Sequence, residues 1–326
     1  MAVIANPLSS TAGQLRPFDL RRDLNAVADL VELCFADTLD PEGERYLRQM
    51  RDAARSATFL RWANAVADQT IMPLSGFVWE EDRRLVGNLS LIPFNIHSQR
   101  YYLIANVAVH PDYRRRGIAR ALTAMAQEQV RRRRGRAAWL HVREENEAAV
   151  RLYLSLGFKE RARRTTWHSL RSSQLETLRT APGTVIGSPR SYHWQQQYAW
   201  LREIYPEHLS WHLPLNIRNF QPGISGFVSR LISGAYTRQW SIEQEGRLQA
   251  TLSWQAFQGY YDYLWLAAPP VMNETAIQAL LTHVRQQFAN RRSLALDFPA
   301  HVIDKPIRDA GFIPHQTLIW MSDGEE

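Results

Sequence analysis

The stretch "NVAVHPDYRRRGIARALTAM", residues 106–125, determines how the first half of this sequence is interpreted. It begins as an apolar strand, turns at His110-Pro111, passes through Arg114–Arg116 and continues beyond Gly117 as a helix. The first backbone N–H groups of a helix lack partners and carry partial positive charge. Gly117 and the small Ala119 would let a diphosphate approach those groups. The stretch therefore predicts an anion cradle, with a solvated arginine loop as the alternative when it is taken alone.

The elements around this stretch alternate between strands and helices. Apolar periodicity predicts a strand at 14–19, a helix at 20–35 and a second helical region at about 41–66. A hairpin at about 76–94, a strand at 100–109, a helix at 117–134 and a strand at 137–142 follow. A short helix at 146–156 ends at Gly157-Phe158, a pairing typical of a left-handed helix cap.

The second half of the chain repeats this order. A Ser-, Thr-, Pro- and Gly-containing connector at about 170–190 precedes a hairpin, a strand, a helix, a strand and a short helix. That last helix ends at Gly311-Phe312, 154 residues after the first Gly-Phe pair. The shared order indicates a duplicated domain, with one copy in residues 1–170 and the other in 171–326.

Composition limits the classes of function. The chain has 326 residues and a formal net charge of +7, which is compatible with an anionic ligand and with an ordinary solvated surface. The arginines at 131–134 and 136 fit the C-terminal end of a helix, and since no nucleic-acid-binding motif is found, a nucleic acid partner is not expected. No apolar run reaches the ~20 residues of a membrane span, and no signal peptide is recognised. The single cysteine, Cys34, fits a reducing compartment, so we expect a cytoplasmic protein without membrane or metal partners.

Two motifs carry a family resemblance. Arg114-x-x-Gly117-x-Ala119, directly after an apolar strand, resembles the acyl-CoA pyrophosphate loop of the GCN5-related N-acetyltransferase (GNAT) superfamily. Downstream, "LHVREENEAAVRLYLSLGF", residues 140–158, resembles the second signature of the family: an Asn, a Tyr seven residues later, then Gly-Phe. The resemblance implies an α+β fold of the α/β/α GNAT type. Two tandem acyl-CoA N-acyltransferase-like domains are expected, each a mixed, mostly antiparallel sheet flanked by helices.

The resemblance also implies an acetyl-CoA co-substrate and its contacts. The backbone of the strand end would line the pantetheine arm, with an N–H group facing the thioester oxygen. Backbone N–H groups from Arg115 to Arg120 would hold the pyrophosphate, and Asn146 would bind the pantetheine. The expected cofactor-binding residues are Val107, Ala108, Val109, Arg114, Arg115, Arg116, Gly117, Ile118, Ala119, Arg120, Asn146 and Tyr153.

Two residues are candidates for acid–base chemistry. Tyr153 matches the general acid of the family, since a phenol with an ordinary pKa of about 10 keeps its proton at pH 7. A tyrosine packed in the core is the alternative. His141 stands in "LHV" where relatives that acetylate protein N-termini have "LEV", and a neutral imidazole could replace the glutamate as general base. Glu144 and Glu145 are alternatives for the base, and a merely structural histidine remains open.

The second half lacks the matching chemistry. The offset of 154 residues carries Tyr153 to Ile307, and "PPVM" stands before the helix at Asn273 where an Arg-x-x-Gly-x-Ala loop would be needed. Prolines remove N–H donors, so this copy is expected to be degenerate. The sequence thus predicts an N-acetyltransferase in which a primary amine attacks acetyl-CoA directly in a ternary complex. A catalytically silent CoA-binding sensor is the alternative. The acceptor, a small-molecule amine or a protein N-terminus or lysine, and the choice between monomer and homodimer stay open.

Overall fold

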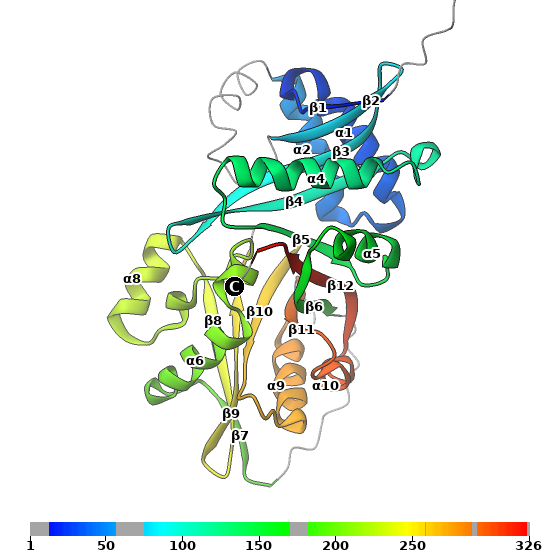
Figure 1. Ribbon diagram of the computed structural model, residues 1–326. Helices are drawn as coiled ribbons and strands as arrows, with labels where there is room; N and C mark the ends of the chain where they lie inside the picture. Colours follow the sequence, from blue (N-terminus) through cyan, green and yellow to red (C-terminus); the bar gives the residue numbers. More distant parts are fainter. Residues whose placement is uncertain (1–12, 57–74, 170–181, 258, 289–291, 325–326) are drawn as a thin grey trace, which may run out of the picture. The chain divides into compact units, whose positions relative to one another are not determined.

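The computed structural model describes residues 13–56, 75–169, 182–257, 259–288 and 292–324. Its contacts divide the chain into two compact units. Unit 1 contains the residues up to Val142, then Asn146–Lys159 and the residues from Met321 onward. Unit 2 contains Arg143–Glu145 and Glu160–Trp320. Figure 1 shows both units and labels most of their helices and strands.

Unit 1 is built on a mixed sheet with the strand order β1-β2-β3-β4-β5. All neighbouring pairs are antiparallel except β4 and β5, which run parallel. A parallel pair needs a crossover, and helix α4 provides it. The elements are β1 (Gln14–Pro17), α1 (Leu20–Phe35), η1 (Ala36–Thr38), α2 (Pro41–Arg55), β2 (Gly76–Glu81), β3 (Arg84–Ile96), β4 (Gln99–Val109), η2 (Pro111–Tyr113), α4 (Ile118–Arg132), β5 (Ala138–Arg143) and α5 (Glu147–Ser155).

Helices cover both faces of this sheet. The apolar side of α1 packs with α2 against Val78 and Ala108, and these residues form a continuous buried cluster. Helix α4 lies on the other face, where a side chain at Gly87 would meet Ile118 at 2.8 Å. Glycine at this position therefore lets α4 approach the sheet closely. The three-layer arrangement fixes the N-terminus of α4 beside the end of β4.

Unit 2 repeats the plan with a larger sheet of order β12-β6-β11-β10-β9-β8-β7. β10 and β11 run parallel, joined through α9, whereas β7-β8, β8-β9, β9-β10 and β6-β11 are antiparallel. Its elements are β6 (Lys159–Ser169), β7 (Thr184–Gly187), η3 (Ser191–His193), α6 (Trp194–Ile204), α7 (Glu207–Ser210), η4 (Ile217–Phe220), α8 (Gly223–Ser233), β8 (Thr237–Gln244), β9 (Arg247–Gln255), β10 (Tyr261–Ala267), α9 (Glu274–Gln287), β11 (Ser293–Pro299), α10 (Asp304–Asp309) and β12 (Phe312–Ser322).

The predicted fold class is confirmed: each unit is a mixed, mostly antiparallel sheet flanked by helices. Both predicted Gly-Phe caps follow a short helix, with φ of 87° at Gly157 and 83° at Gly311. The helical region expected at 41–66 is α2 up to Arg55, and its remainder lies outside the described residues. The division at residue 170 stays a prediction. The compact units assign Arg143–Glu145 and nearly all of β6, which pairs with β11, to unit 2, and the residues from Met321 onward to unit 1.

Candidate active site

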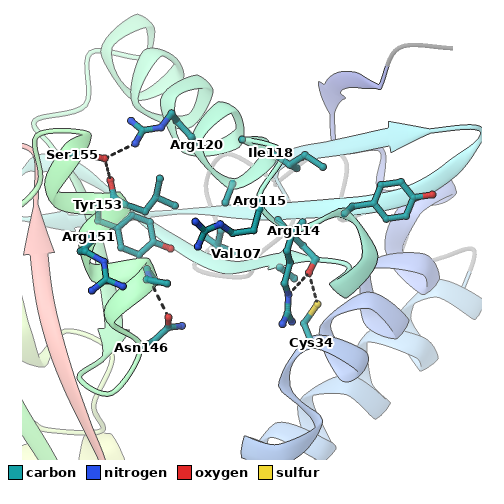
Figure 2. Close-up of a pocket in the computed structure, with 18 of the residues that line it drawn as sticks. Cys34, Val107, Arg114, Arg115, Ile118, Arg120, Asn146, Arg151, Tyr153 and Ser155 are labelled. Carbon is teal, nitrogen blue, oxygen red and sulfur yellow. Dashed lines mark hydrogen bonds between the residues drawn. The ribbon is translucent and has the colours of Figure 1, made fainter. Parts of the chain in front are cut away.

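A pocket of about 780 Å³ opens in unit 1 where the end of β4, the turn into α4, the start of α4 and helix α5 meet (Figure 2). Every predicted cofactor-binding residue except Arg116 lines it, and His141 does not. The lining residues predicted from sequence are Val107, Ala108, Val109, Arg114, Arg115, Gly117, Ile118, Ala119, Arg120, Asn146 and Tyr153. The volume falls within the range typical of cofactor pockets, roughly 300–1,000 Å³.

Strand β4 contains a bulge just before the residues that enter the pocket. Asn88 of β3 lies opposite Ala108. Ser90, two positions further along β3, lies opposite Ala105, so β4 supplies one residue more than β3 over this interval. A bulge bends the strand and changes the direction of the groups that follow it. Here it changes the direction of the backbone at Asn106–Val107, at the edge of the pocket.

The bulge is held by a polar cluster around Asn106, whose φ is 52°. Asparagine adopts this left-handed conformation more readily than most residues. Asn88 Nδ2 donates to the carbonyl oxygen of Asn106 at 3.0 Å. Asn106 Nδ2 donates to the Tyr46 hydroxyl at 2.9 Å and to Ser90 Oγ at 3.3 Å. Both the main chain and the side chain of Asn106 are therefore fixed from β3 and α2.

Beyond the bulge, β4 has an open edge. Its parallel pairing with β5 extends from Tyr102–Ala138 to Ile104–Leu140 only. Among the described residues, no strand pairs with the β5 side of β4 from Ala105 to Val109. An unpaired strand edge offers N–H and C=O groups to an extended ligand. This edge forms one wall of the pocket.

The N-terminus of α4 faces the same pocket without a side-chain cap. Its N-cap is Gly117, with φ of 80°, and the first helical hydrogen bond runs from Ala121 N–H to Gly117 O. The N–H groups of Ile118–Arg120 therefore have no helical acceptor. A Cβ built on Gly117 would have nothing within 4 Å, so the space above this turn is open. Exposed amides, helix dipole and open space together fit a bound anion.

The arginines of the pocket are held by a few local contacts. Arg114 Nε donates to the carbonyl of Val109 at 3.2 Å, and Arg120 donates to Ser155 Oγ at 2.8 Å (Figure 2). Arg115 lines the pocket with φ of 66° and an exposed side chain. These three cations give the pocket a positive potential beside the open amides.

The side chain of Arg116 does not line the pocket. It donates to Glu81 Oε1 at 3.2 Å and to the carbonyl of Asp112 at 3.3 Å. Its guanidinium also lies over the Tyr113 ring, 4.8 Å from the ring centre. The side chain of Arg116 thus stabilises the turn, while only its backbone remains beside the site.

Tyr153 lies on α5 with its ring buried and its phenol directed into the pocket (Figure 2). Phe158 holds the ring edge-on at 5.9 Å between ring centres. Burial raises the pKa of Tyr153 to about 12, because the phenolate would lose its hydration. The phenol therefore keeps its proton through the neutral and moderately alkaline range. The pocket is thus lined by a phenol that is protonated at neutral pH.

Asn146 caps the helix that carries Tyr153. Its Oδ1 accepts a hydrogen bond from Ala149 N–H at 3.1 Å. Its side chain also lines the pocket, so the amide nitrogen can donate to a ligand carbonyl. Asn146 thereby links the start of α5 to the site.

The candidate bases lie outside this pocket. His141 keeps solvent-accessible surface on β5, but protein atoms around it lower its pKa to about 4 because the charged imidazolium loses hydration. The imidazole is neutral at pH 7 with either this pKa or the ordinary one of about 6.5. Glu144 is bound by Arg163 and lies 3.2 Å from His301 Nε2, and Glu145 pairs with Arg143. Neither carboxylate lines the pocket.

Sequence reasoning missed the contributions of α1 and of the outer face of α5. Cys34 and Phe35 line the pocket, and Cys34 Sγ donates to the carbonyl of Val109 at 3.3 Å. Burial raises the pKa of the Cys34 thiol. Arg151 and Ser155 of α5 also line the pocket. The i, i+4 spacing of these two residues around Tyr153 was the available signal, whereas nothing local identified the end of α1.

Comparison with known proteins agrees with this geometry. Residues 27–158 match the model of the acetyltransferase (GNAT) family. Over this segment the chain is similar to GNAT-family proteins. Over 63 residues the chain is 43% identical to a [ribosomal protein bS18]-alanine N-acetyltransferase of Escherichia coli strain K12 and 41% identical to one of Salmonella typhimurium. Those matches cover 19% of this chain and 43% of each relative, so the chain spans less than half the length of these curated relatives.

Solved structures extend the fold similarity to the whole chain. A GCN5-related N-acetyltransferase from Sphaerobacter thermophilus has a TM-score of 0.59 and 15% identity over 95% of both chains. A tandem GNAT protein from the clavulanic acid biosynthesis pathway has a TM-score of 0.50 and 16% identity, covering 97% of this chain and all of its own. The predicted tandem GNAT fold is therefore confirmed, with the family-model match confined to the first half.

Among the described residues, no group of three or more His, Cys, Asp or Glu side chains could hold a metal ion. Likewise, none of the described helices has the length and apolar character needed to span a membrane.

Proposed function

We propose that the chain is an acetyl-CoA-dependent N-acetyltransferase that transfers the acetyl group to a primary amine by direct attack in a ternary complex. One observation carries the proposal: the open, uncapped N-terminus of α4 and the buried Tyr153 phenol line the same pocket. The first suits a diphosphate and the second suits a leaving thiolate. The GNAT-family match of residues 27–158 supports this combination.

The binding contacts follow from the pocket walls. The backbone N–H groups from Arg115 to Arg120 would hold the pyrophosphate of acetyl-CoA, with Arg114, Arg115 and Arg120 adding positive charge. Asn146 would donate to a carbonyl of the pantetheine arm. The open edge of β4 would take this arm as an added strand. The bulge at Asn106 would leave the backbone of Val107 and Ala108 facing the reacting carbonyl.

The chemistry requires a neutral amine, a stabilised oxyanion and a protonated thiolate. Bound acetyl-CoA supplies an activated thioester. A backbone N–H near Val107 would stabilise the charge that develops on the carbonyl oxygen. Tyr153 would give its proton to the departing sulfur, a role typically worth ~10²–10⁴-fold in rate. His141 would accept the proton of the amine through water, and its pKa, lowered to about 4, would make it a weak base at pH 7.

The two domains would divide the work. We keep the division at residues 1–170 and 171–326 as a proposal, with acetyl-CoA chemistry in the first domain. In the second, Asn273 caps α9 with its own side chain, and Pro269 and Pro270 offer no N–H groups. This second domain would serve a structural role. The single cysteine, Cys34, supports a location in a reducing compartment such as the cytoplasm.

The test is an acceptor screen with two readouts. Binding of acetyl-CoA is measured by calorimetry, and release of free CoA thiol is measured with polyamines, amino sugars, amino acids and a peptide that begins with alanine. The peptide belongs in the panel because the E. coli relative is an alanine N-acetyltransferase. We expect one acetyl-CoA per chain and thiol release with at least one amine. Absence of acetyl-CoA binding would refute the proposal.

A second candidate, a catalytically silent CoA-binding sensor, is favoured by one observation. Neither His141 nor Glu144 lines the pocket, so the general base is not in direct reach of its interior. Stoichiometric acetyl-CoA binding without thiol release for any amine of the panel would favour this candidate over the enzyme.

A further inference from the structure

Helix α8 of unit 2 presents an apolar face to solvent. Its apolar residues follow the i, i+3, i+4, i+7, i+8 spacing that places them on one side of a helix. All are exposed, from 43% at Val228 to 83% at Ile224. We name this surface the α8 face; it consists of Ile224, Phe227, Val228, Leu231 and Ile232.

The opposite side of the same helix is polar and points inward. Ser229 Oγ donates to Asn219 Oδ1 at 2.7 Å, and Ser233 Oγ donates to the same oxygen at 3.2 Å. Arg230 donates to the Asn219 carbonyl at 2.7 Å. Gly226 is buried against Gln221, whose carbonyl oxygen would lie 1.7 Å from an added Cβ. The helix is therefore reversed relative to an ordinary surface helix, with its polar side docked and its apolar side in water.

The size of the α8 face is that of an interface. The five side chains of the face are 43–83% exposed. Tyr236, just after the helix, is 72% exposed and adds to this apolar surface. At about 200 Å² for a large apolar residue, the five residues of the α8 face expose on the order of 700 Å², and Tyr236 brings the total to about 800 Å². One partner of a standard interface contributes about this area, and the largest apolar patch of a typical monomer is about 300–600 Å².

The composition of the face points to a partner like itself. None of its residues is charged, whereas the cations of this region, Arg218, Arg230 and Arg238, lie outside the face. The face itself therefore offers no ion pair to a charge-steered partner. A lipid surface would require a basic polar side facing headgroups, but Arg230 and the serines of that side are bound to Asn219. A 3-4 spaced apolar seam packs well against a copy of itself across a two-fold axis.

We propose that the α8 face forms a homodimer interface, in which α8 packs against α8 of a second copy of this chain. The two seams interdigitate with Val228 near the two-fold axis, because it lies midway along the face. Residues of the α8 face, which are costly to expose to water, become buried in the dimer. The inference rests on unit 2 alone and is independent of the proposed enzymatic activity.

The experiment uses the full chain and three variants. Sedimentation velocity and light scattering of the wild-type protein are expected to show a dimer at about 100 µM, with dissociation on dilution. Leu231→Glu should weaken dimerisation by at least ~100-fold, because it places two charges in the apolar seam. Val271→Glu is the matched control: Val271 is 90% exposed but lies outside the α8 face, so its dimer should match wild type. Val228→Cys should form an intermolecular disulfide on mild oxidation.

Each other outcome overturns the proposal. A wild-type chain that is monomeric at this concentration, or equal dimerisation of Leu231→Glu, removes the interface. A Leu231→Glu protein that loses thermal stability as a monomer shows that the face is covered within the chain. Capture of wild-type monomer, but not of Leu231→Glu, by vesicles of anionic phospholipid assigns the face to a membrane surface.

Discussion

Helices α4 and α9 occupy the same place in their units, since each connects two parallel neighbouring strands, yet they begin in opposite ways. Helix α4 starts at Gly117, which has no side chain to cap it. Helix α9 starts at Asn273, whose Oδ1 accepts from Ala276 N–H at 3.1 Å. The first-turn amides of α4 are left without a side-chain acceptor, whereas one of those of α9, the Ala276 N–H, is satisfied by the Asn273 side chain.

The strands that precede these helices differ in the same sense. β4 carries the bulge at Asn106, whereas the pairing of β10 with β9 runs without a register shift from Tyr263–Gln255 to Ala267–Thr251. A regular strand is the simpler solution for a sheet, and bulges often occur next to active sites. The comparison teaches that the fold itself requires neither the open helix start nor the bulge. Both features in unit 1 are those that the proposed binding of acetyl-CoA would use.

The largest effect is expected from Tyr153→Phe. The substitution keeps the ring against Phe158 and removes only the proton donor. Turnover should fall by at least ~10²-fold, while the Kd of acetyl-CoA changes little. Steady-state kinetics and calorimetry measure the two quantities. Unchanged turnover would show that Tyr153 is not the general acid. The contrast between Tyr153 and Ile307, its equivalent in unit 2 by the 154-residue offset, would then have no catalytic meaning.

The pH profile examines the same phenol without mutation. Its pKa is raised to about 12, so it remains protonated as the pH rises past 10, where an ordinary tyrosine would be half ionised. The kcat of the wild-type enzyme should therefore show no alkaline decline below about pH 11, provided that the protein stays folded. A decline centred near pH 10 would mean that the acid has an ordinary pKa.

Gly117→Asn gives the N-cap position of α4 the residue type that caps α9. Asparagine tolerates the left-handed backbone at this position, and its Cβ would meet no atom within 4 Å. Its side chain would occupy the open space beside the first-turn amides and compete with the pyrophosphate, although the capping bond of Asn273 itself requires the extended backbone found there (φ −85°). The Kd of acetyl-CoA should rise about 10- to 30-fold, which corresponds to about 1.4–2 kcal/mol. Gly117→Ala, which brings a Cβ without the acceptor, should weaken binding less; equal losses would contradict competition for the amides.

Asn106→Ala removes the side chain that holds the bulge. We expect kcat to fall by about 10-fold with a smaller change in KM, because the bulge orients the backbone that faces the reacting carbonyl. Asn106→Gly is the control, since glycine adopts the positive φ without strain but makes no contact with Tyr46 or Ser90. If Asn106→Gly is fully active, backbone conformation rather than the polar cluster is what matters.

Much of this contrast could be predicted from the sequence because it is local. The open loop at Arg114–Gly117 and the cap at Asn273 are each determined by residues within a few positions of the helix start. Because no Arg-x-x-Gly-x-Ala pattern precedes Asn273, the sequence predicted that α9 starts differently from α4, as the structure shows. The alternation of strands and helices was equally local, since it depends on short apolar periods.

Contacts between distant segments could not be predicted in this way. The place of β6 beside β11 depends on strand pairing across more than a hundred residues. Cys34 reaches the pocket only because α1 packs below the end of β4. The exposure of the apolar side of α8 could not be predicted from the sequence either, because its apolar spacing is that of an ordinary buried helix face. Periodicity identifies a face but not what it contacts.

The loop arginines offer a matched pair for a smaller effect. Arg115→Ala removes a cation that lines the pocket and should raise the Kd of acetyl-CoA by about 3- to 10-fold at low salt. Arg116→Ala removes a cation paired with Glu81 and should change the Kd by less than about 2-fold. Calorimetry at two salt concentrations measures both. A larger loss for Arg116→Ala would show that the loop rearranges when the ligand binds.

The smallest effect is expected at the other helix. Asn273→Gly gives α9 the start that α4 has, and it removes contacts from Asn273 Nδ2 to Gln244 at 2.8 Å and Gln249 at 3.3 Å. Thermal denaturation should show a Tm lower by about 2–4 °C, as expected for a loss of ~1 kcal/mol. The number of acetyl-CoA molecules bound per chain should stay at one, because Pro269 and Pro270 supply no N–H groups before the helix. A second bound acetyl-CoA would mean that the cap alone keeps unit 2 silent, and that the bulge and the arginine loop of unit 1 are not needed to hold the ligand.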